Sequence, residues 1–357
     1  MALNGRSNAT GYFNNHVRSL VKSIVLFFFS FGVLIFGACN TKEPGEQQQS
    51  ATKEPEKAKP VVNVPAIDAD SAYAFVAKQV SFGPRIPGSK AHANCAEWLE
   101  SKLRTYIPEV MVQKGVVTTF DQKKFEIKNI IPSYQPENKN RILLCAHWDT
   151  RPFADRDQGI NKNKAFDGAN DGASGVGVLI EIARQLSIAQ PQIGVDIILF
   201  DLEDYGQPEE SSFPEMQNSW CLGSQYWAKN LHVPGYFAKY GILLDMVGAK
   251  GAVFPKEGYS VNFAPALVDR VWNTAAALGY GSYFINATSG GITDDHVYIN
   301  QLANIPCIDI IHYDVINSDF FGHHHKVSDT MEQIDPGILK MVGQTVLQVV
   351  FEDAVAN

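Results

Sequence analysis

Four polar patches of this 357-residue sequence combine side chains that can bind a metal ion and move protons. They contain His147, Asp171, the neighbouring pair Glu203 and Asp204, and His325. Imidazole nitrogen and carboxylate oxygen are ligands of tetrahedral zinc, and a catalytic zinc keeps one position open. Several converging carboxylates are costly unless a cation or a proton neutralises them. Each patch alone is explained as well by a helix cap or a solvated loop, but their joint order and placement favour a zinc site.

The segments that must position these patches alternate in character from residue 68 onward. Strand-like runs lie at 110–120, 125–134, 141–145, 195–200, 241–244 and 305–311, and helical patterns lie at 68–78, 89–106, 172–187, 264–278 and 336–353. Asp68 and Ser89 are expected to be helix N-caps. The alternation predicts an α/β fold: one globular domain with a mixed central β-sheet flanked by helices on both faces. The patches follow strand ends, where open α/β sheets place ligand sites.

The amino-terminal segment has a different character. Residues 1–22 contain basic residues and no acidic one, and an apolar run at 23–38 then ends in small residues before Cys39. This pattern is typical of a secretory signal, and the run is shorter than the ~20 residues of a membrane span. Small residues before a cysteine resemble the lipobox of bacterial lipoproteins, although Phe36 and Gly37 are not its commonest residues.

These features predict three parts of the chain: a signal peptide at 1–38, a lipidated Cys39 with a flexible tether at 39–65, and a catalytic domain at 66–357. The tether is rich in Pro, Glu, Lys and Gln and has no aromatic residue, so it buries too little apolar surface to become ordered. The interpretation implies an exported lipoprotein, periplasmic or on the outer surface, that contacts the membrane through Cys39. Plain secretion and an uncleaved short anchor are the alternatives.

Charge and cysteine content restrict the partners further. The net charge is −8, whereas a nucleic-acid-binding protein needs a basic patch, so no nucleic-acid partner is expected. Cys95, Cys145, Cys221 and Cys307 are scattered and form no CxxC motif. The sequence favours buried free thiols, and it could not assign the pairing of a disulfide.

Together the patches resemble the zinc aminopeptidase and glutaminyl cyclase superfamily, whose motifs occur here in the same order from residues 82–85 to the last helix. The resemblance implies that Asp171, in a D-x-A-S-G turn, binds zinc. It implies that Glu203 is the catalytic acid/base and Asp204 a metal ligand, and that His325 is the last ligand. Asp204 stands where many members have Glu, which changes the reach of the side chain and not the type of ligand.

The two branches of this superfamily differ in reaction. The aminopeptidases bind a second zinc through a His and an Asp that correspond to His147 and Asp245. The cyclases use one zinc, and Asp294 matches their Asp-Asp-His motif where aminopeptidases usually show Ser-Asp-His. In the cyclases this aspartate shares a proton with the one corresponding to Asp245. Asp294 therefore favours a bacterial glutaminyl cyclase, although it could also be a surface residue beside a structural Asp295–His296 pair.

The resemblance predicts a glutaminyl-peptide cyclotransferase that converts the N-terminal Gln of peptides or proteins to pyroglutamate, with release of ammonia and one catalytic Zn²⁺. Asp245 and Asp294 join Glu203 as catalytic residues, and His147 is the remnant of a second metal site. The alternatives are a two-zinc aminopeptidase that hydrolyses N-terminal residues, and a peptide-binding lipoprotein without activity, which the intact Glu203 disfavours. Trp220 and His324 are candidate substrate contacts, and Trp220 is equally compatible with a core position.

Overall fold

The computed structural model describes residues 62–356. The predicted signal peptide, Cys39 and most of the predicted tether lie outside the described residues. The helices and strands follow one another as α1 (Ala69–Val80), α2 (Lys90–Arg104), β1 (Val110–Thr118), β2 (Lys124–Tyr134), β3 (Arg141–His147), η1 (Gly159–Asn163), α3 (Ala173–Ala189), β4 (Gly194–Phe200), α4 (Leu222–Lys229), β5 (Gly241–Asp245), β6 (Phe254–Lys256), α5 (Gly258–Phe263), α6 (Pro265–Ala277), β7 (Phe284–Thr288), α7 (Asp295–Ala303), β8 (Cys307–Ile311), β9 (Tyr313–Asp314), β10 (Asp319–Phe320), η2 (Met331–Gln333) and α8 (Pro336–Val355).

A six-stranded sheet in the order β1-β2-β4-β3-β5-β8 forms the centre of the domain. β1, β2 and β4 pair antiparallel, whereas β4, β3, β5 and β8 pair parallel, so the sheet is mixed as the sequence predicts. The register places His147 opposite Phe200 and Asp245 opposite Ile311. The carboxyl ends of the parallel strands are therefore level, and the side chains that follow them meet at one edge.

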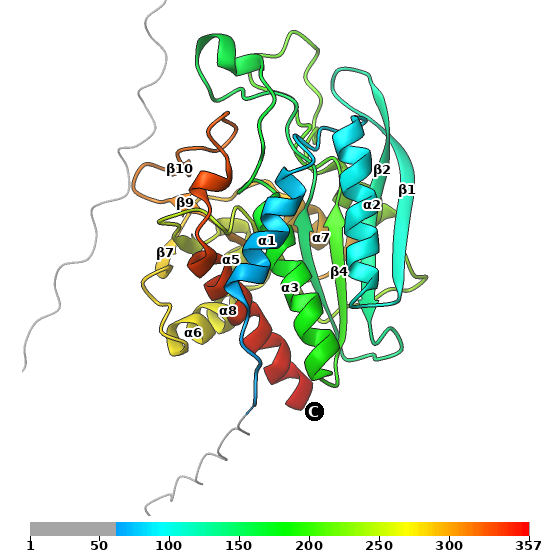
Figure 1. The fold of residues 1–357 in the computed structure, drawn as a ribbon, viewed down its shortest axis with the longest axis vertical. Coiled ribbons are helices and arrows are strands. Elements are labelled where there is room, and N and C mark those ends of the chain that lie inside the picture. The colour runs from blue at the N-terminus through cyan, green and yellow to red at the C-terminus, as the bar shows by residue number, and fades with distance from the viewer. Residues whose placement is uncertain (1–61, 357) are drawn as a thin grey trace, which may run out of the picture. The chain divides into compact units, whose positions relative to one another are not determined.

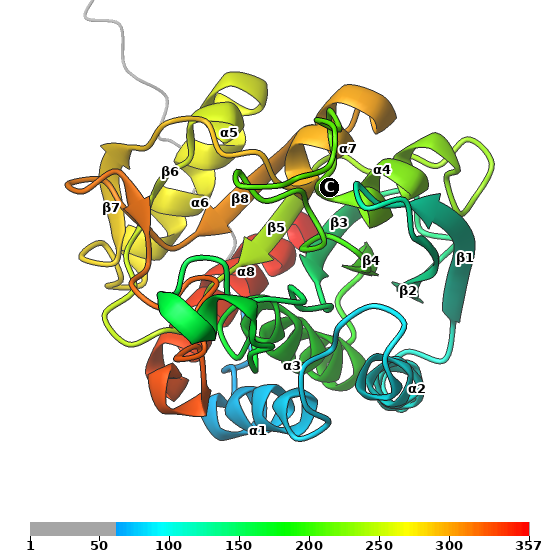
Figure 2. The ribbon, with the colours of Figure 1, turned by 90° about the horizontal axis from the view of Figure 1, so that it is seen from above.

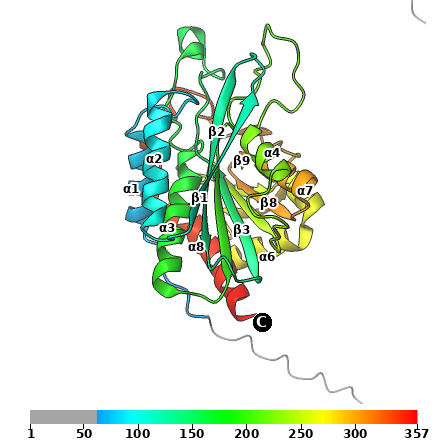
Figure 3. The same ribbon diagram turned by 90° about the vertical axis from the view of Figure 1, so that its right-hand side faces the viewer.

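Helices cover both faces of this sheet, as predicted (Figure 3). On one face, alternate strand residues such as Ile142 and Leu144 join the main core beneath α1, α2, α3 and α8. On the other, Leu143 and Cys145 pack with Trp227 of α4 and with residues of α7. The parallel strands β4, β3, β5 and β8 are buried on both sides, which explains why they are largely apolar, whereas the edge strand β1 alternates between exposed and more buried residues.

The amino-terminal ends of the first two helices are capped as the sequence predicts. Asp68 accepts a hydrogen bond from the backbone N–H of Ser71, and Ser89 accepts one from that of His92. The last residues of the predicted tether lie against the domain, where the carbonyl of Pro65 accepts a hydrogen bond from Gln344. Within residues 62–356, no helix combines the length and the apolar character needed to cross a bilayer.

The cysteines of the described part are free and buried, as expected: Cys95, Cys145, Cys221 and Cys307.

The loops that follow the parallel strands gather at one end of the domain. The segment with η1, the loop at 205–220 and the β9–β10 hairpin all lie toward the upper end in Figure 1, and Figure 2 views the same end from above. These loops supply the walls of a cavity above the strand ends.

Candidate metal and catalytic site

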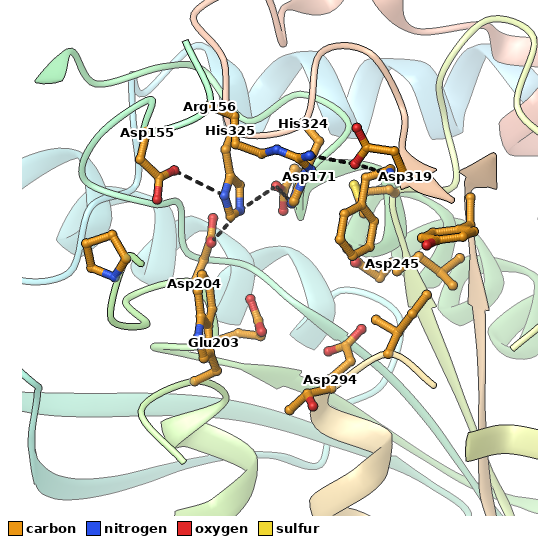
Figure 4. A pocket seen from close by; sticks show the side chains of 18 of the residues that line it. Asp155, Arg156, Asp171, Glu203, Asp204, Asp245, Asp294, Asp319, His324 and His325 are labelled. Carbon is orange, nitrogen blue, oxygen red and sulfur yellow. Dashed lines mark hydrogen bonds and ion pairs between the residues drawn. The ribbon is translucent and has the colours of Figure 1, made fainter. Parts of the chain in front are cut away.

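The strand ends and the neighbouring loops line a pocket of about 670 Å³ (Figure 4). This volume is typical of a small-molecule site. His147, almost fully buried, is not part of the lining and contacts Asp171 and Asp245 instead. The other predicted site residues all line the pocket: Asp171, Glu203, Asp204, Trp220, Asp245, Asp294, His324 and His325.

Asp171 reaches the pocket from the loop between β3 and α3. Asp329 accepts hydrogen bonds from the backbone N–H groups of Asn170 (2.9 Å) and Asp171 (3.1 Å), and the peptide bond between Asp171 and Gly172 is cis. Residue 172 must be glycine, because a β-carbon there would lie 2.5 Å from Cε1 of His147. The loop backbone therefore fixes the carboxylate of Asp171 beside that imidazole.

Glu203 and Asp204 occupy a tight turn at the end of β4. The buried carboxylate of Asp149 accepts hydrogen bonds from the backbone N–H groups of Glu203 (3.1 Å) and Asp204 (3.3 Å). The backbone N–H of Arg151 donates to Oδ2 of Asp204 at 2.8 Å. Only Oδ1 of Asp204 is then left to face the centre of the pocket.

His325 lies between three carboxylates (Figure 4). Its Nε2 lies 3.0 Å from Oδ1 of Asp204 and 3.6 Å from Oδ2 of Asp171, and its Nδ1 lies 3.3 Å from Asp155. Burial alone would lower the pKa of His325, but these carboxylates, Asp204 above all, outweigh it and raise the pKa to about 9. These carboxylates attract positive charge, and a metal cation would be held at the same place.

His324 is a possible fourth ligand that the sequence placed with the substrate. Its Nε2 lies 3.8 Å from Oδ2 of Asp171, and ligand atoms of Asp171, His324 and His325 all lie within 4.8 Å of one another. Arg156 contacts its Nδ1 at 2.9 Å. His324 therefore borders both the metal position and the wall of the pocket.

A second group of possible ligands lies next to the first and shares Asp171 with it. Nε2 of His147 lies 3.1 Å from Asp171 and 3.3 Å from Asp245. Ligand atoms of these three residues also lie within 4.8 Å of one another. The geometry thus offers two adjacent cation positions that share Asp171.

Buried polar atoms without hydrogen-bond partners indicate that the site fits a cation. Among the described residues, no partner is found for Oδ2 of Asp171, Oδ1 of Asp204, Oδ1 of Asp245 or either ring nitrogen of His147. A buried polar atom without any partner costs about 1–3 kcal/mol, although Oδ1 of Asp204 also lies at ion-pair distance from His325, and Nε2 of His147 from Asp171 and Asp245. A bound metal would satisfy them together, and oxygen with imidazole nitrogen is a donor set that suits zinc.

The carboxylates deeper in the pocket favour protonation. Burial raises the pKa of Glu203 well above its usual range, and Asp294 and Asp204 add to this although His147 opposes it. Burial also raises the pKa of Asp245 to about 7. His147 lowers this pKa, and the charge of Asp294 offsets part of that lowering. A carboxyl group that can hold or release a proton near neutral pH is suited to acid/base catalysis.

Trp220 forms part of the pocket wall, so its location is neither the core nor an isolated surface position. Its ring stacks on His325 with centroids 5.9 Å apart and an interplanar angle of 8°. The guanidinium of Arg151 lies 4.5 Å from the centroid of the same ring. Trp220 therefore supports a predicted metal ligand and borders the space for the substrate.

Several supporting residues were missed by the sequence interpretation. Asp149 and Asp329 hold the two loops that carry the predicted ligands. Both lie in the polar patches, close in sequence to His147 and His325, and this proximity could have identified them as supporting residues. Asp155 contacts His325 and is held by Arg151, but it lies in a loop without any recognisable pattern. Cys221, whose thiol contacts Glu203, gave no signal either.

Known proteins similar to this chain include a Zn-dependent exopeptidase and glutaminyl cyclases. Residues 129–350 match the model of peptidase family M28. A Zn-dependent exopeptidase from Parabacteroides distasonis is 52% identical with a TM-score of 0.79, over 81% of this chain and 99% of that one. Tannerella forsythia glutaminyl cyclase is 51% identical with a TM-score of 0.78, over 80% and 99%. The protein belongs to peptidase family M28, the zinc exopeptidase-like class of α/β proteins.

The curated relatives are more distant. The glutaminyl-peptide cyclotransferase of Bos taurus is 26% identical over 246 residues, which cover 58% of this chain and 61% of that enzyme. The chain spans between 44% and 61% of the length of the first curated relatives that it matches. The names of the related structures include both exopeptidase and glutaminyl cyclase, so the choice of reaction depends on the residues of this site.

Proposed function

We propose that this protein is a glutaminyl-peptide cyclotransferase, which converts the N-terminal Gln of peptides or proteins to pyroglutamate and releases ammonia. The observation that carries the proposal is the position of Asp294, a buried carboxylate that lines the pocket and has an oxygen within 4.8 Å of ligand atoms of Glu203 and Cys221. The structural relatives of about 50% identity that are named glutaminyl cyclases support it as well.

A single zinc ion in this proposal is held by Asp171, Asp204 and His325, with His324 beside them. When bound, zinc acts as a Lewis acid on the carbonyl of the substrate's side-chain amide. Arg151 supports this set through its backbone N–H to Asp204 and its ion pair with Asp155.

Glu203 is the acid/base of the proposed reaction. It takes a proton from the α-amine, the amine nitrogen forms a bond to the side-chain carbonyl carbon, and the proton returns to the departing ammonia. A raised pKa suits a group that must both accept and release this proton. Because the ring closure is intramolecular, correct orientation of the substrate supplies much of the rate.

Asp245 and Asp294 act as a pair in this proposal. Asp294 contributes to raising the pKa of Asp245, so the two carboxyl groups favour sharing one proton. The remaining negative charge attracts the α-ammonium of the incoming peptide. The apolar lining of the pocket faces the hydrocarbon part of the substrate: Met246, Ile292, Tyr313 and Phe320.

A two-zinc aminopeptidase is the second candidate, and the grouping of His147, Asp171 and Asp245 favours it. Product and metal content separate the two. We expect a Gln-initiated dipeptide amide to release ammonia, the enzyme to contain about one zinc per chain, and His147→Asn to leave that zinc content unchanged. Release of free glutamine, with two zincs that fall to one in His147→Asn, would establish the aminopeptidase.

We further propose that the protein is exported and anchored to a membrane through a lipid on Cys39. The support is the basic segment, the apolar run and the small residues before Cys39. Cells that express Cys39→Ala are expected to lose the protein from the membrane fraction. If the variant remains there as abundantly as the wild type, the lipid anchor is wrong.

A further inference from the structure

The thiol of Cys221 contacts the carboxylate of Glu203 directly. Its Sγ donates a hydrogen bond to Oε1 of Glu203 at 3.1 Å, and the side chain of Cys221 is fully buried. Neither the proposed zinc ligands Asp171, Asp204 and His325 nor the proposed proton transfers include this thiol. A donor that touches the acid/base nevertheless influences where that carboxylate lies.

The backbone holds Cys221 rigidly against the turn that carries Glu203. The N–H of Cys221 donates to the carbonyl of Glu203 and that of Leu222 to the carbonyl of Leu202, both at 2.9 Å. Residue 223 must be glycine, because a β-carbon there would lie 2.0 Å from the carbonyl oxygen of Asp201. This close approach of the two segments fixes the position of Sγ relative to Glu203.

The backbone conformation of Cys221 is costly, so the contacts of this residue must offset the cost. Its φ of 58° lies in the left-handed region, where Gly or Asn would be less strained. The side chain does not cap α4, because no capping hydrogen bond is formed by Cys221. The contact with Glu203, and not helix capping, therefore offsets the strain at Cys221.

The environment of the thiol keeps it a hydrogen-bond donor. Burial raises the pKa of Cys221 well above its usual range, and the carboxylates of Glu203, Asp295 and Asp294 raise it further. A thiol has one proton to donate, and here that proton is directed to Oε1. Oε2 of Glu203, which lies 3.9 Å from Nδ1 of His147, is then the oxygen left to exchange protons with the substrate.

We infer that Cys221 is a positioning residue: its S–H group holds Oε1 of Glu203 so that the carboxylate presents Oε2 to the reacting amine. The inference rests on the proposed function only in so far as Glu203 is the acid/base, a role that it would also have in the aminopeptidase. Each test below is therefore run on whichever product the wild-type enzyme forms, and its outcome is independent of the choice between the two reactions.

The first test replaces the donor in the full-length protein. Cys221→Ala is expected to lower kcat about tenfold, since the hydrogen bond that orients the carboxyl group of Glu203 is lost, with KM and zinc content unchanged. Cys221→Ser, whose hydroxyl donates to the same oxygen, should recover most of kcat. Cys95→Ala, a buried free thiol in α2, is the control and should leave kcat unchanged.

Two results of this test would overturn the inference. One is a kcat in Cys221→Ala equal to that of the wild type. The other is a loss in Cys221→Ser as large as in Cys221→Ala, which would indicate that the cavity and not the donor matters.

The second test detects the hydrogen bond without an activity assay and without changing Cys221. The amide of Glu203→Gln is a weaker acceptor than the carboxylate, so the infrared S–H stretching band of Cys221 should shift to higher frequency. This shift should dominate the S–H region of the difference spectrum between variant and wild type. A difference spectrum without an S–H band would contradict the assigned contact.

Discussion

At the scale of single residues, several non-glycine residues beside the reacting groups have a left-handed backbone, as do others in loops elsewhere. Leu202 and Met246, which flank Glu203 and Asp245, have φ values of 52° and 49°, and His325 itself has a φ of 51°. Each left-handed residue that is not glycine costs about 1–3 kcal/mol. The surrounding packing must compensate for this cost, so the side chains of the site are held in position before any substrate arrives.

Replacement of Glu203 by Gln tests the acid/base while the shape of the site is kept. We expect Glu203→Gln to lower kcat by about 10²–10⁴-fold, because proton transfer by a positioned group contributes on this order. The zinc content should stay unchanged, since Glu203 is not a predicted ligand. Ammonia release and metal analysis check both parts, and a kcat within a few-fold of the wild type would remove Glu203 from the mechanism.

Replacement of Asp294 by Asn tests the proposed carboxyl pair. Asp294 contributes to raising the pKa of Asp245 to about 7, so removing its charge should lower that pKa. The pH at which Asp245 loses its proton then moves down, and the corresponding limb of the kcat profile should move to lower pH. The profile is measured beside that of the wild type, and an unshifted limb would mean that the two groups do not titrate together.

At the scale of elements, the loop at 205–220 follows the end of β4 and forms part of the wall of the pocket. Trp220 of this loop stacks on His325 and packs against Arg151. Gly206 permits the arrangement, because a β-carbon there would lie 1.9 Å from Cδ2 of Trp220. The loop therefore packs against the predicted ligand His325 through Trp220 and directly follows the predicted ligand Asp204.

Gly206→Ala should displace Trp220 from His325. We expect a loss of about 1–3 kcal/mol in the free energy of unfolding from overpacking, together with a higher KM and weaker zinc binding. Gly281→Ala is the control, because its β-carbon would meet only ordinary contacts in a turn away from the pocket. Thermal unfolding, kinetics and zinc titration measure these effects, and equal KM values in both variants would contradict the role of Trp220.

The start of α7 depends on a buried pair beside Asp294. His296 contacts Oε2 of Glu257 at 3.0 Å, and Glu257 also accepts backbone hydrogen bonds from Tyr259, Ser260 and Ile292. Burial would raise the pKa of Glu257, but the bond with His296 outweighs it and lowers the pKa to about 2. Because the pKa in the folded protein is below the unfolded value, the ionised form stabilises the fold.

This stabilisation is present above the unfolded pKa near 4.5 and is lost as the pH falls toward 2. Glu257→Gln is expected to cost about 3 kcal/mol of unfolding free energy at neutral pH. The difference from the wild type should shrink as the pH falls through this window. Denaturant titrations along a pH series measure it, with the exposed Glu100→Gln as control. A constant difference at all pH values would refute the linkage.

At the scale of the whole molecule, the predicted zinc ligands come from three distant parts of the chain. Asp171 precedes α3, Asp204 follows β4, and His325 precedes η2. A metal held by all three binds the folded state and not the unfolded chain, so it stabilises the fold by mass action. Metal removal should therefore affect stability as well as activity.

We expect a chelator to abolish turnover and to lower Tm by roughly 5 °C or more, from a loss of about 2–3 kcal/mol. Added zinc should restore both. Asp171→Asn is the matched control, because it lacks a ligand and its Tm should barely respond to the chelator. A wild-type Tm that the chelator leaves unchanged would argue against a ligand set shared by the three elements.

The sequence alone predicted the long elements and the identity of the polar patches. Apolar runs and caps such as Asp68 and Ser89 act locally, so α1, α2 and the central strands were expected close to their observed bounds. The short elements α4, α5, β6, β7 and α7 were not predicted. Their few residues contain too little periodicity, and tertiary contacts with the sheet decide their conformation.

What the sequence determined by itself is the chemical inventory: which residues can bind zinc, which can move a proton, and the α/β frame that brings strand ends together. Only the tertiary structure decided how these groups combine, because distances between residues far apart in the chain depend on packing. It placed His324 beside Asp171, brought Asp155 to His325, and brought the thiol of Cys221 to Glu203. None of these contacts leaves a local pattern in the sequence.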